Sequence, residues 1–272
     1  MDVYMEVTFD QLARVGQGEV LARWFREAQT RFFSVIADSE TTDKGEIFSR
    51  ASVAADMDGP SLRVGQVGKN WKKFEVQLTP FPWWADLDYV TGDVTLGWAR
   101  SVQSTYEGYC NAVVGLLLGA EKRANGTYCA TLVEFLRVAL DEVNPAFGRI
   151  EQDLSFERAN LDIALHRRLR RSLRESRDHL RGYAWVTVCP QELIERLGGC
   201  EALVASNAFY RVISLLAGGA LLQASETLPG YSDEVMQKVF EALAPVLPAG
   251  APQPDPAHPH ARFVAQDAGL LR

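Results

Sequence analysis

The sequence has little that would serve a membrane or an export pathway. No apolar run approaches the about 18 residues needed to cross a bilayer, and the longest clear run covers residues 112–120. The N-terminus carries acidic residues where a signal peptide needs a basic start and a long apolar stretch. These absences predict a cytoplasmic protein with no membrane partner.

Cysteine is scarce and irregularly spaced. The four cysteines stand 19, 60 and 11 positions apart, which matches neither a paired metal-ligand spacing nor a Cys-x-x-Cys redox motif. We therefore expect reduced, mostly buried thiols and no metal site. The positions are Cys110, Cys129, Cys189 and Cys200.

Residues for nucleophilic catalysis are also few. Histidine is the usual base for a serine or cysteine nucleophile, and the chain has only four. His258 and His260 lie near the C-terminus, whereas His166 and His179 lie among arginines, whose charge should lower their pKa values. A Cys189–His179 pair can be drawn, but a buried, inert thiol is the favoured interpretation of Cys189. We assign no catalytic residue.

Nucleotide and nucleic-acid binding have little support. No glycine-rich phosphate loop occurs, because Gly16-Gln17-Gly18 is followed by Leu21 where a third glycine would stand. Lys and Arg total 28 against 35 Asp and Glu, a net charge of −7, so no general attraction to nucleic acid is expected. We predict no cofactor.

Hydrophobic periodicity supplies the expected elements in the first half of the chain. A helical face predicts a helix over residues 18–37, although residues 31–36 could instead form a strand. Alternation predicts antiparallel strands between residues 60 and 98, with a hairpin turn at residues 91–93. The alternating residues are Leu62 and Val64, then Phe74, Val76 and Leu78, then Val94, Leu96 and Trp98.

The second half shows helices and strands in turn. Residues 110–118 favour a strand over a short buried helix, and residues 126–144 and 156–180 predict helices. A strand is expected over residues 183–188, and a short helix should begin at Pro190 and stop at Gly198-Gly199. A hairpin of residues 209–216 and 220–224 and a helix beginning after Ser232 complete the pattern.

These elements predict an α+β fold, with a mostly antiparallel sheet and helices packed on it. The simplest organisation is a single domain over residues 1–247, with two subdomains meeting near residue 120 as the alternative. Residues 248–272 are rich in proline and alanine, so we expect a mobile tail there.

Arginines crowd the helix expected at residues 156–180. Residues 157–181 hold eight arginines and four acidic residues in an otherwise acidic chain. If the leucines at four-residue spacing face the core, Arg167, Arg171 and Arg174 point toward solvent and could meet an acidic partner surface. The alternative is a solvated helix face with pairs such as Arg171–Glu175. A nucleic-acid contact here would show steep salt dependence.

A second unusual feature is the segment Thr79-Pro80-Phe81-Pro82-Trp83-Trp84. Prolines hold such a loop extended, and Phe81, Trp83 and Trp84 could anchor a partner. The alternative is a loop folded back over the sheet, since tryptophan is highly buried on average.

The C-terminal third resembles a known family. Residues 182–188, then Leu197-Gly198-Gly199, residues 218–224 and residues 239–245 follow one another as in bacterial immunity proteins, which are encoded beside polymorphic or type VI secreted toxins. The resemblance covers about residues 180–247. It implies a cytoplasmic α+β protein that binds and blocks a cognate toxin, and it transfers no catalytic residue.

The sequence thus favours a non-enzymatic protein-binding function, most concretely toxin neutralisation. The alternative is a hydrolase or transferase with a carboxylate-based site that leaves no motif. A cavity with convergent Asp or Glu side chains of raised pKa would favour that alternative. The sequence does not determine the oligomeric state.

Overall fold

The computed structural model describes residues 2–10, 17–34, 47–63, 67–104, 106, 108–152 and 157–272. These residues divide into two compact units. Residues 3–8 and 118–272 form the larger one, and residues 9–117, with Asp2, form the smaller one. Within each unit every pairing of described strands is antiparallel, which confirms the predicted α+β class. Whether residues 1–247 behave as one domain stays a prediction.

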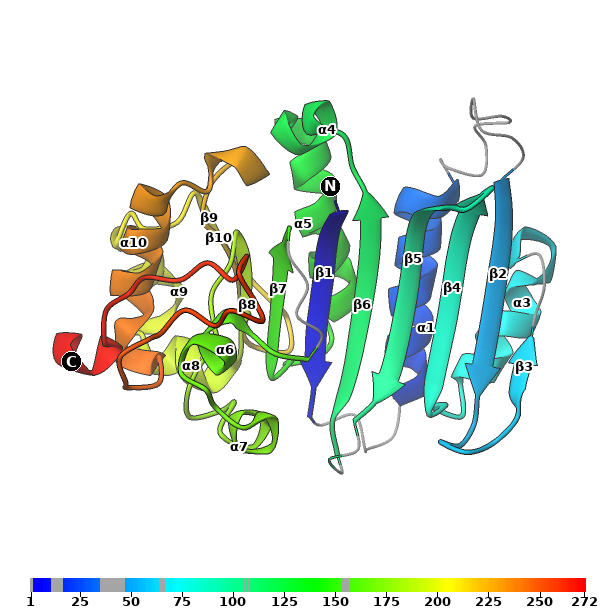
Figure 1. Ribbon diagram of the computed structural model, residues 1–272, viewed down its shortest axis with the longest axis horizontal. Coiled ribbons are helices and arrows are strands. Elements are labelled where there is room, and N and C mark those ends of the chain that lie inside the picture. Colours follow the sequence, from blue (N-terminus) through cyan, green and yellow to red (C-terminus); the bar gives the residue numbers. More distant parts are fainter. Residues whose placement is uncertain are drawn as a thin grey trace. The chain divides into compact units, whose positions relative to one another are not determined.

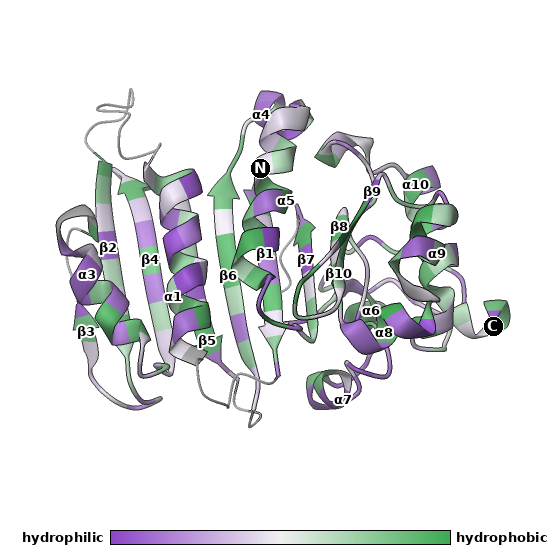
Figure 2. Cartoon of the chain, turned by 180° about the vertical axis from the view of Figure 1, so that it is seen from behind, coloured by the Kyte–Doolittle hydropathy of each residue, from purple (hydrophilic) through white to green (hydrophobic). Residues whose placement is uncertain are grey.

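The smaller unit is a sheet with helices on one face. Its strands follow the order β3-β2-β4-β5-β6, and α1 and α3 lie behind them in Figure 1 and in front of them in Figure 2. The elements are α1 (Gln17–Ala28), the π-helical turn η1 (Gln29–Phe33), β2 (Ile47–Ala54), β3 (Ser61–Arg63), α3 (Val67–Leu78), β4 (Trp84–Thr91), β5 (Val94–Gln103) and β6 (Cys110–Leu117).

The core of this unit lies between the sheet and those helices. Burial alternates along β4, so Leu87 and Tyr89 face the helices, and the ring of Phe33 stacks on Tyr89 at 4.9 Å between centroids. A side chain at Gly97 would place its Cβ 2.8 Å from Phe33, so glycine lets the helical segment approach β5. Gly92 has a φ of 54° in the β4–β5 turn, which confirms the predicted hairpin.

The structure decides two predictions for the smaller unit. The helix expected from residue 18 is confirmed through Ser34, and residues 31–33 are π-helical, so the strand alternative is wrong there. The strand expected at Phe74, Val76 and Leu78 is wrong, because these residues belong to α3. Phe74 and Leu78 are buried while Val76 is exposed, which fits helical rather than two-residue spacing. Residues 35–37 and Val64 lie outside the described residues.

The larger unit has the strand order β1-β7-β8-β10-β9. In Figure 1, α5 lies behind its strands and the C-terminal segment passes in front of β8. The elements are β1 (Asp2–Phe9), α4 (Ala120–Ala124), α5 (Gly126–Leu140), β7 (Phe147–Glu151), α6 (Asn160–Ala164), α7 (Leu169–Arg174), β8 (Val186–Cys189), α8 (Gln191–Arg196), α9 (Gly199–Ala205), β9 (Arg211–Ser214), β10 (Ala220–Gln223), η2 (Leu228–Gly230), α10 (Asp233–Leu243), η3 (Ala244–Val246) and η4 (Ala268–Leu271).

Local sequence signals place several of these elements as predicted. The Asn125 side chain accepts a hydrogen bond from the Tyr128 amide at the start of α5, and Ser232 accepts one from the Val235 amide at the start of α10. Gly198 and Gly199 both have a φ of 85°, which only glycine adopts at little cost, and α8 stops before them. Strands β6, β9 and β10 also lie within predicted ranges, and β8 overlaps the strand predicted over residues 183–188 but ends one residue later.

The single helix expected over residues 156–180 is wrong. The chain forms two short helices, α6 and α7, and His166 between them has a φ of 48°. A left-handed residue cannot continue a right-handed helix, and neither glycine nor proline marks the break in the sequence. Residue 156 lies outside the described residues.

The C-terminal residues contact the rest of the larger unit. The Gln253 amide donates to the Ala164 carbonyl at 2.7 Å, and the Val264 amide donates to the Tyr183 hydroxyl at 2.8 Å. The mobility expected for residues 248–272 stays a prediction. None of the described helices has the length and apolarity that crossing a membrane requires.

Candidate functional site

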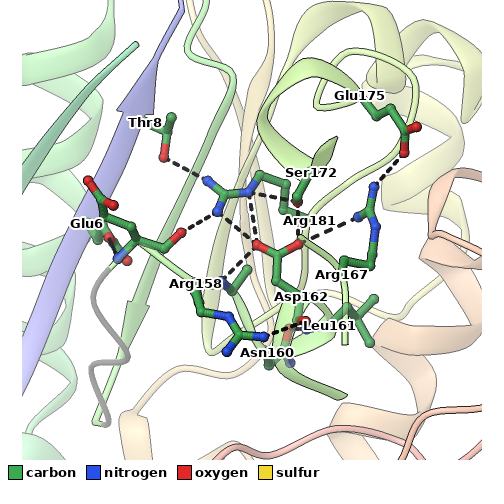
Figure 3. A network of polar contacts seen from close by, with 12 residues as sticks. Glu6, Thr8, Arg158, Asn160, Leu161, Asp162, Arg167, Ser172, Glu175 and Arg181 are labelled. Carbon is green, nitrogen blue, oxygen red and sulfur yellow. Dashed lines mark hydrogen bonds and ion pairs between the residues drawn. The ribbon is translucent and has the colours of Figure 1, made fainter. Parts of the chain in front are cut away.

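A buried ion pair between Asp162 and Arg181 holds α6 and α7 in place. Asp162 is fully buried, and it accepts hydrogen bonds from Arg181 Nη2 at 2.8 Å and from the Ala159 amide at 3.1 Å. The Ser172 hydroxyl also donates to it. Arg181 in turn donates to the Thr8 hydroxyl at 3.1 Å, which ties these segments to β1 (Figure 3).

This arrangement has a structural role. A buried charge is costly unless it is paired and hydrogen-bonded, and both members of the pair meet that condition. The guanidinium of Arg181 also lies 5.6 Å from the centre of the Phe147 ring. Neighbouring groups therefore satisfy the hydrogen-bonding capacity of Asp162 and Arg181, and the pair offers no reactive group.

A second buried arginine lies on β7. Arg149 Nη2 lies 2.7 Å from Glu6 Oε2, and its Nη1 lies 2.8 Å from Glu151 Oε1. Burial opposes the charge of Arg149, but Glu151 and Glu6 outweigh burial and raise its pKa. Arg149 therefore stays charged and is paired with both carboxylates.

A cavity of about 490 Å³ opens beside this cluster. Five segments that are far apart in the sequence line the cavity, so no local sequence motif could predict it. Its volume lies within the range of small-ligand pockets, roughly 300 to 1,000 Å³. The lining comes from residues 149–152, 160–163, 183–185, 228–231 and 259–262.

Three aromatic side chains, Tyr183, Trp185 and Tyr231, line this cavity. The indole of Trp185 donates to the Ser225 carbonyl at 2.8 Å, and the Tyr183 hydroxyl accepts from Val264. The Tyr231 hydroxyl is buried and has no hydrogen-bond partner among the described residues. Burial, with smaller contributions from Tyr183 and Glu151, raises the pKa of Tyr231, so its hydroxyl stays protonated.

The three arginines singled out in the sequence divide into two groups. Arg171 and Arg174 lie on α7 and are exposed. The side chain of Arg167 is only 9% exposed, so the expectation that it faces solvent is wrong. Because the chain breaks at His166, Arg167 turns inward, where Nη2 lies 2.9 Å from Glu175 and Nη1 lies 3.6 Å from Asp162 (Figure 3).

The exposed part of α7 is strongly basic. Arg171 keeps 73% of its side chain exposed although its Nε bonds Glu175 at 2.8 Å, as the sequence spacing suggested. Burial acts to raise the pKa of Glu175, but hydrogen bonds from Arg171 and Arg167 outweigh burial and lower it. We call the exposed arginines the α7 basic surface; they are Arg168, Arg170, Arg171 and Arg174.

The aromatic segment lies in the smaller unit and ends at Trp84, the first residue of β4. Phe81, Trp83 and Trp84 are each partly buried. Hydrogen bonds to its backbone hold the segment in place, because the Trp83 amide donates to the Ala55 carbonyl at 3.2 Å and the Gln103 side chain donates to the Phe81 carbonyl at 2.9 Å. The structure thus does not bring these aromatics together with the α7 basic surface in one unit.

The cysteines and histidines form no catalytic arrangement among the described residues. All four cysteines are free, and burial raises the pKa of Cys110 to about 12 and also raises that of Cys189. No hydrogen bond joins Cys189 to His179 in the described part of the chain. Burial and then Arg167, Arg272 and Arg196 lower the pKa of His179, as expected from its arginine neighbours. The searched residues contain no group of three metal-ligating side chains.

Comparison with solved structures shows a likeness of fold. A Pseudomonas aeruginosa protein described as T6SS protein PA0821 matches with a TM-score of 0.58 and 11% sequence identity, over 90% of this chain and 76% of that chain. No family model matches the sequence. No curated protein matches it either.

Proposed function

We propose that this chain is a toxin-neutralising immunity protein that binds and blocks a secreted toxin without catalysis. The observation that carries the proposal is the fold shared with a protein described as belonging to the type VI secretion system, a likeness that spans nine-tenths of this chain. The resemblance of residues 180–247 to immunity proteins supports the same assignment on separate grounds.

The α7 basic surface is the contact that we propose for the toxin in the larger unit. Arg168, Arg170 and Arg174 have no ion-pair partner among the described residues, so their charges are available to a partner. Exposed arginines contribute little to folding but can steer an acidic surface into place. Phe81, Trp83 and Trp84 are the alternative contact, where an apolar anchor would slow dissociation.

The enzyme alternative gains no specific support from the described residues. Within them Glu151 is the one carboxylate that lines the cavity, and it is bound to Arg149. The carboxyl group with a clearly raised pKa is Asp88, which lies on β4 of the other unit. Paired catalytic carboxylates need both groups at one site.

Co-expression tests the proposal. The gene adjacent to this one is expressed in a host cell with the chain or with an empty vector, and colony growth is counted. We expect the chain to restore growth by several orders of magnitude and to co-purify with the toxin. An adjacent gene cluster for metabolism, or a toxin that kills equally with the chain present, would refute it.

A further inference from the structure

We propose that the uncovered face of the smaller unit's sheet is the surface through which two copies of this chain associate. The proposal goes beyond the toxin-neutralising function and does not depend on it. The face belongs to β2, β4, β5 and β6, on the side of the sheet away from α1 and α3, and we call it the open sheet face. No described helix or strand of the smaller unit lies in front of it in Figure 1.

The open sheet face is apolar although no helix of its unit covers it. Side chains alternate along β4, so Val90 points away from the helices that Leu87 and Tyr89 face. Strand pairing places Phe48 beside Val90, and Phe48 and Leu117 are each 45% exposed. The uncovered face of an antiparallel sheet is normally polar, and an exposed apolar patch marks an interaction site. The apolar residues of the face are Phe48, Trp84, Val90, Trp98, Val102 and Leu117.

The centre of the open sheet face is broad and flat. The ring of Trp98 lies across β6, because a Cβ at Gly115 would come within 2.4 Å of the indole. The guanidinium of Arg100 lies 5.1 Å from the centre of the same ring, and its Nε lies 2.9 Å from Asp86. These side chains hold one another down against the strands, so the surface that they form suits another flat surface rather than a single inserted side chain.

The charges of the open sheet face are balanced. On this side the four strands carry two acidic and two basic side chains, although the whole chain has a net charge of −7. A balanced face does not select a strongly charged partner, and two copies of it do not repel each other. The charged residues are Arg50, Asp86, Asp88 and Arg100.

Two of these charges lack an ion-pair partner. Arg100 is paired with Asp86, but neither Arg50 nor Asp88 forms an ion pair with a described residue, although they stand opposite each other on β2 and β4. Burial and then Asp86 raise the pKa of Asp88 to about 6, because Arg100 and Arg50 do not fully offset these effects. One copy thus presents an unpaired cation and an unpaired anion side by side.

A second copy of the chain can pair both groups at once. In a contact with two-fold symmetry, a residue that meets a second residue on the partner is met by that residue in return. A two-fold axis along the strands between β2 and β4 sets Arg50 of each copy against Asp88 of the other, and Phe48 against Val90. The two sheets then pack face to face with their strands roughly aligned, as in β-sandwiches.

The size of the open sheet face implies a weak dimer. Its strands are at least eight residues long. Four strands about 4.8 Å apart, with about 3.4 Å per residue, give roughly 500 Å² per copy. Standard interfaces bury about 800 Å² per partner, so we expect a dissociation constant on the order of 10 μM.

Sedimentation velocity of the whole chain tests the proposal without any other protein. Near neutral pH the average mass should rise from one chain to two as the concentration increases from about 1 to about 300 μM. Phe48→Asp puts a charge into the apolar part of the contact and should raise the dissociation constant at least about twentyfold. Val76→Asp is the matched control and should change nothing, because Val76 is an exposed apolar residue of the same unit but lies on α3, behind the sheet.

Charge exchange tests the pairing of Arg50 with Asp88. Arg50→Asp and Asp88→Arg should each weaken dimerisation about tenfold, whereas the double exchange should restore it to within about threefold of the parent chain. Circular dichroism checks that each variant is folded. If Asp88→Arg does not fold, Asp88→Asn replaces it and should weaken dimerisation about threefold.

Three results would overturn the dimer: a chain that stays monomeric at about 300 μM, a dimer that Phe48→Asp leaves intact, or a folded double exchange that does not restore association. A monomer in which Phe48→Asp weakens binding of the adjacent gene's product would place that product on the face instead. The two proposals fail separately, because a chain that dimerises without protecting contradicts only the proposed function, and a monomer that protects contradicts only the dimer.

Discussion

At the scale of single residues, buried polar side chains hold the short helices and loops of the larger unit together. The ion pair of Asp162 and Arg181 holds the two short helices α6 and α7 in place, and Arg167 lies beside Asp162 at its edge. The sequence showed the many arginines but not which of them turn inward. The inward direction of Arg167 depends on His166, whose backbone adopts the left-handed conformation. Only glycine adopts this conformation readily, so a histidine at this position gives no sign of it in the sequence.

Trp185→Ala should lower the free energy of unfolding by about 3–5 kcal/mol, as large aromatic deletions in cores do. The side chain is 1% exposed. The variant also removes one of the two donors to the Ser225 carbonyl, which keeps the side-chain amide of Gln223. Urea unfolding followed by circular dichroism measures the change; Phe48→Ala, at an exposed aromatic, should shift stability by no more than about 0.5 kcal/mol.

Arg167→Glu should destabilise the larger unit by about 3–5 kcal/mol, because it breaks a mostly buried pair and sets a third carboxylate beside Asp162 and Glu175. The same urea measurement applies. Arg167→Gln should cost less, since it removes the attraction without adding repulsion. A stable Arg167→Glu chain would show that this side chain faces solvent after all.

At the scale of elements, hydrophobic periodicity predicts the secondary structure correctly where one face of an element is buried. It predicts the wrong element where the same residues fit both a helical and a two-residue period. Helices α5 and α10 have clear apolar faces and capping side chains, so both were predicted. In α3 the residues Phe74, Val76 and Leu78 also satisfy a two-residue period, and only Val67 and Trp71 extend the helical one. The cavity could not be predicted, because tertiary contacts alone assemble its five segments.

Reversing two charges on α7, by Arg171→Glu with Arg174→Glu, should leave the melting temperature almost unchanged. Both side chains are exposed, and such pairs add little to folding. Association with the toxin should slow about tenfold at low salt, with less effect at high salt. Surface plasmon resonance over a salt series measures this.

Arg211→Glu on β9 is the matched control, because it reverses an exposed charge outside α7. If the α7 double variant binds as the parent chain does, the contact moves to the aromatic segment. Trp83→Ala should then speed dissociation with little response to salt.

On β4, Asp88→Asn should stabilise the chain at neutral pH. Burial first, and then Asp86, raises the pKa of Asp88 from 3.8 to about 6, against the opposing charges of Arg100 and Arg50. The native state therefore binds more protons than the unfolded state between these values, so stability falls as pH rises through this window. Asparagine does not ionise, so the variant does not lose stability as the pH rises through this window.

The gain in melting temperature for Asp88→Asn should accordingly be present at pH above about 6 and vanish below about pH 4. Calorimetry over a pH series measures it, and Asp58→Asn, at an exposed carboxylate of the same unit, corrects for the loss of one charge. A gain that persists unchanged in acid would contradict the assignment to Asp88 ionisation.

At the scale of the whole molecule, three features bear on the proposed function: an acidic chain, a fold shared with a T6SS protein and a basic surface on the larger unit. Under the function that we propose, the chain neutralises a toxin by binding to it and covering its functional surface. Binding of this kind is stoichiometric and leaves the partner chemically unchanged, whereas an enzyme acts on many partners in turn.

Titration of the purified adjacent-gene toxin with the purified chain distinguishes neutralisation by binding from neutralisation by catalysis. Toxin activity should fall linearly to zero at one chain per toxin, and the toxin recovered by denaturation should have an unchanged intact mass. Full inactivation at a small fraction of one chain per toxin, or a toxin of altered mass, would contradict neutralisation by binding and identify the chain as an enzyme.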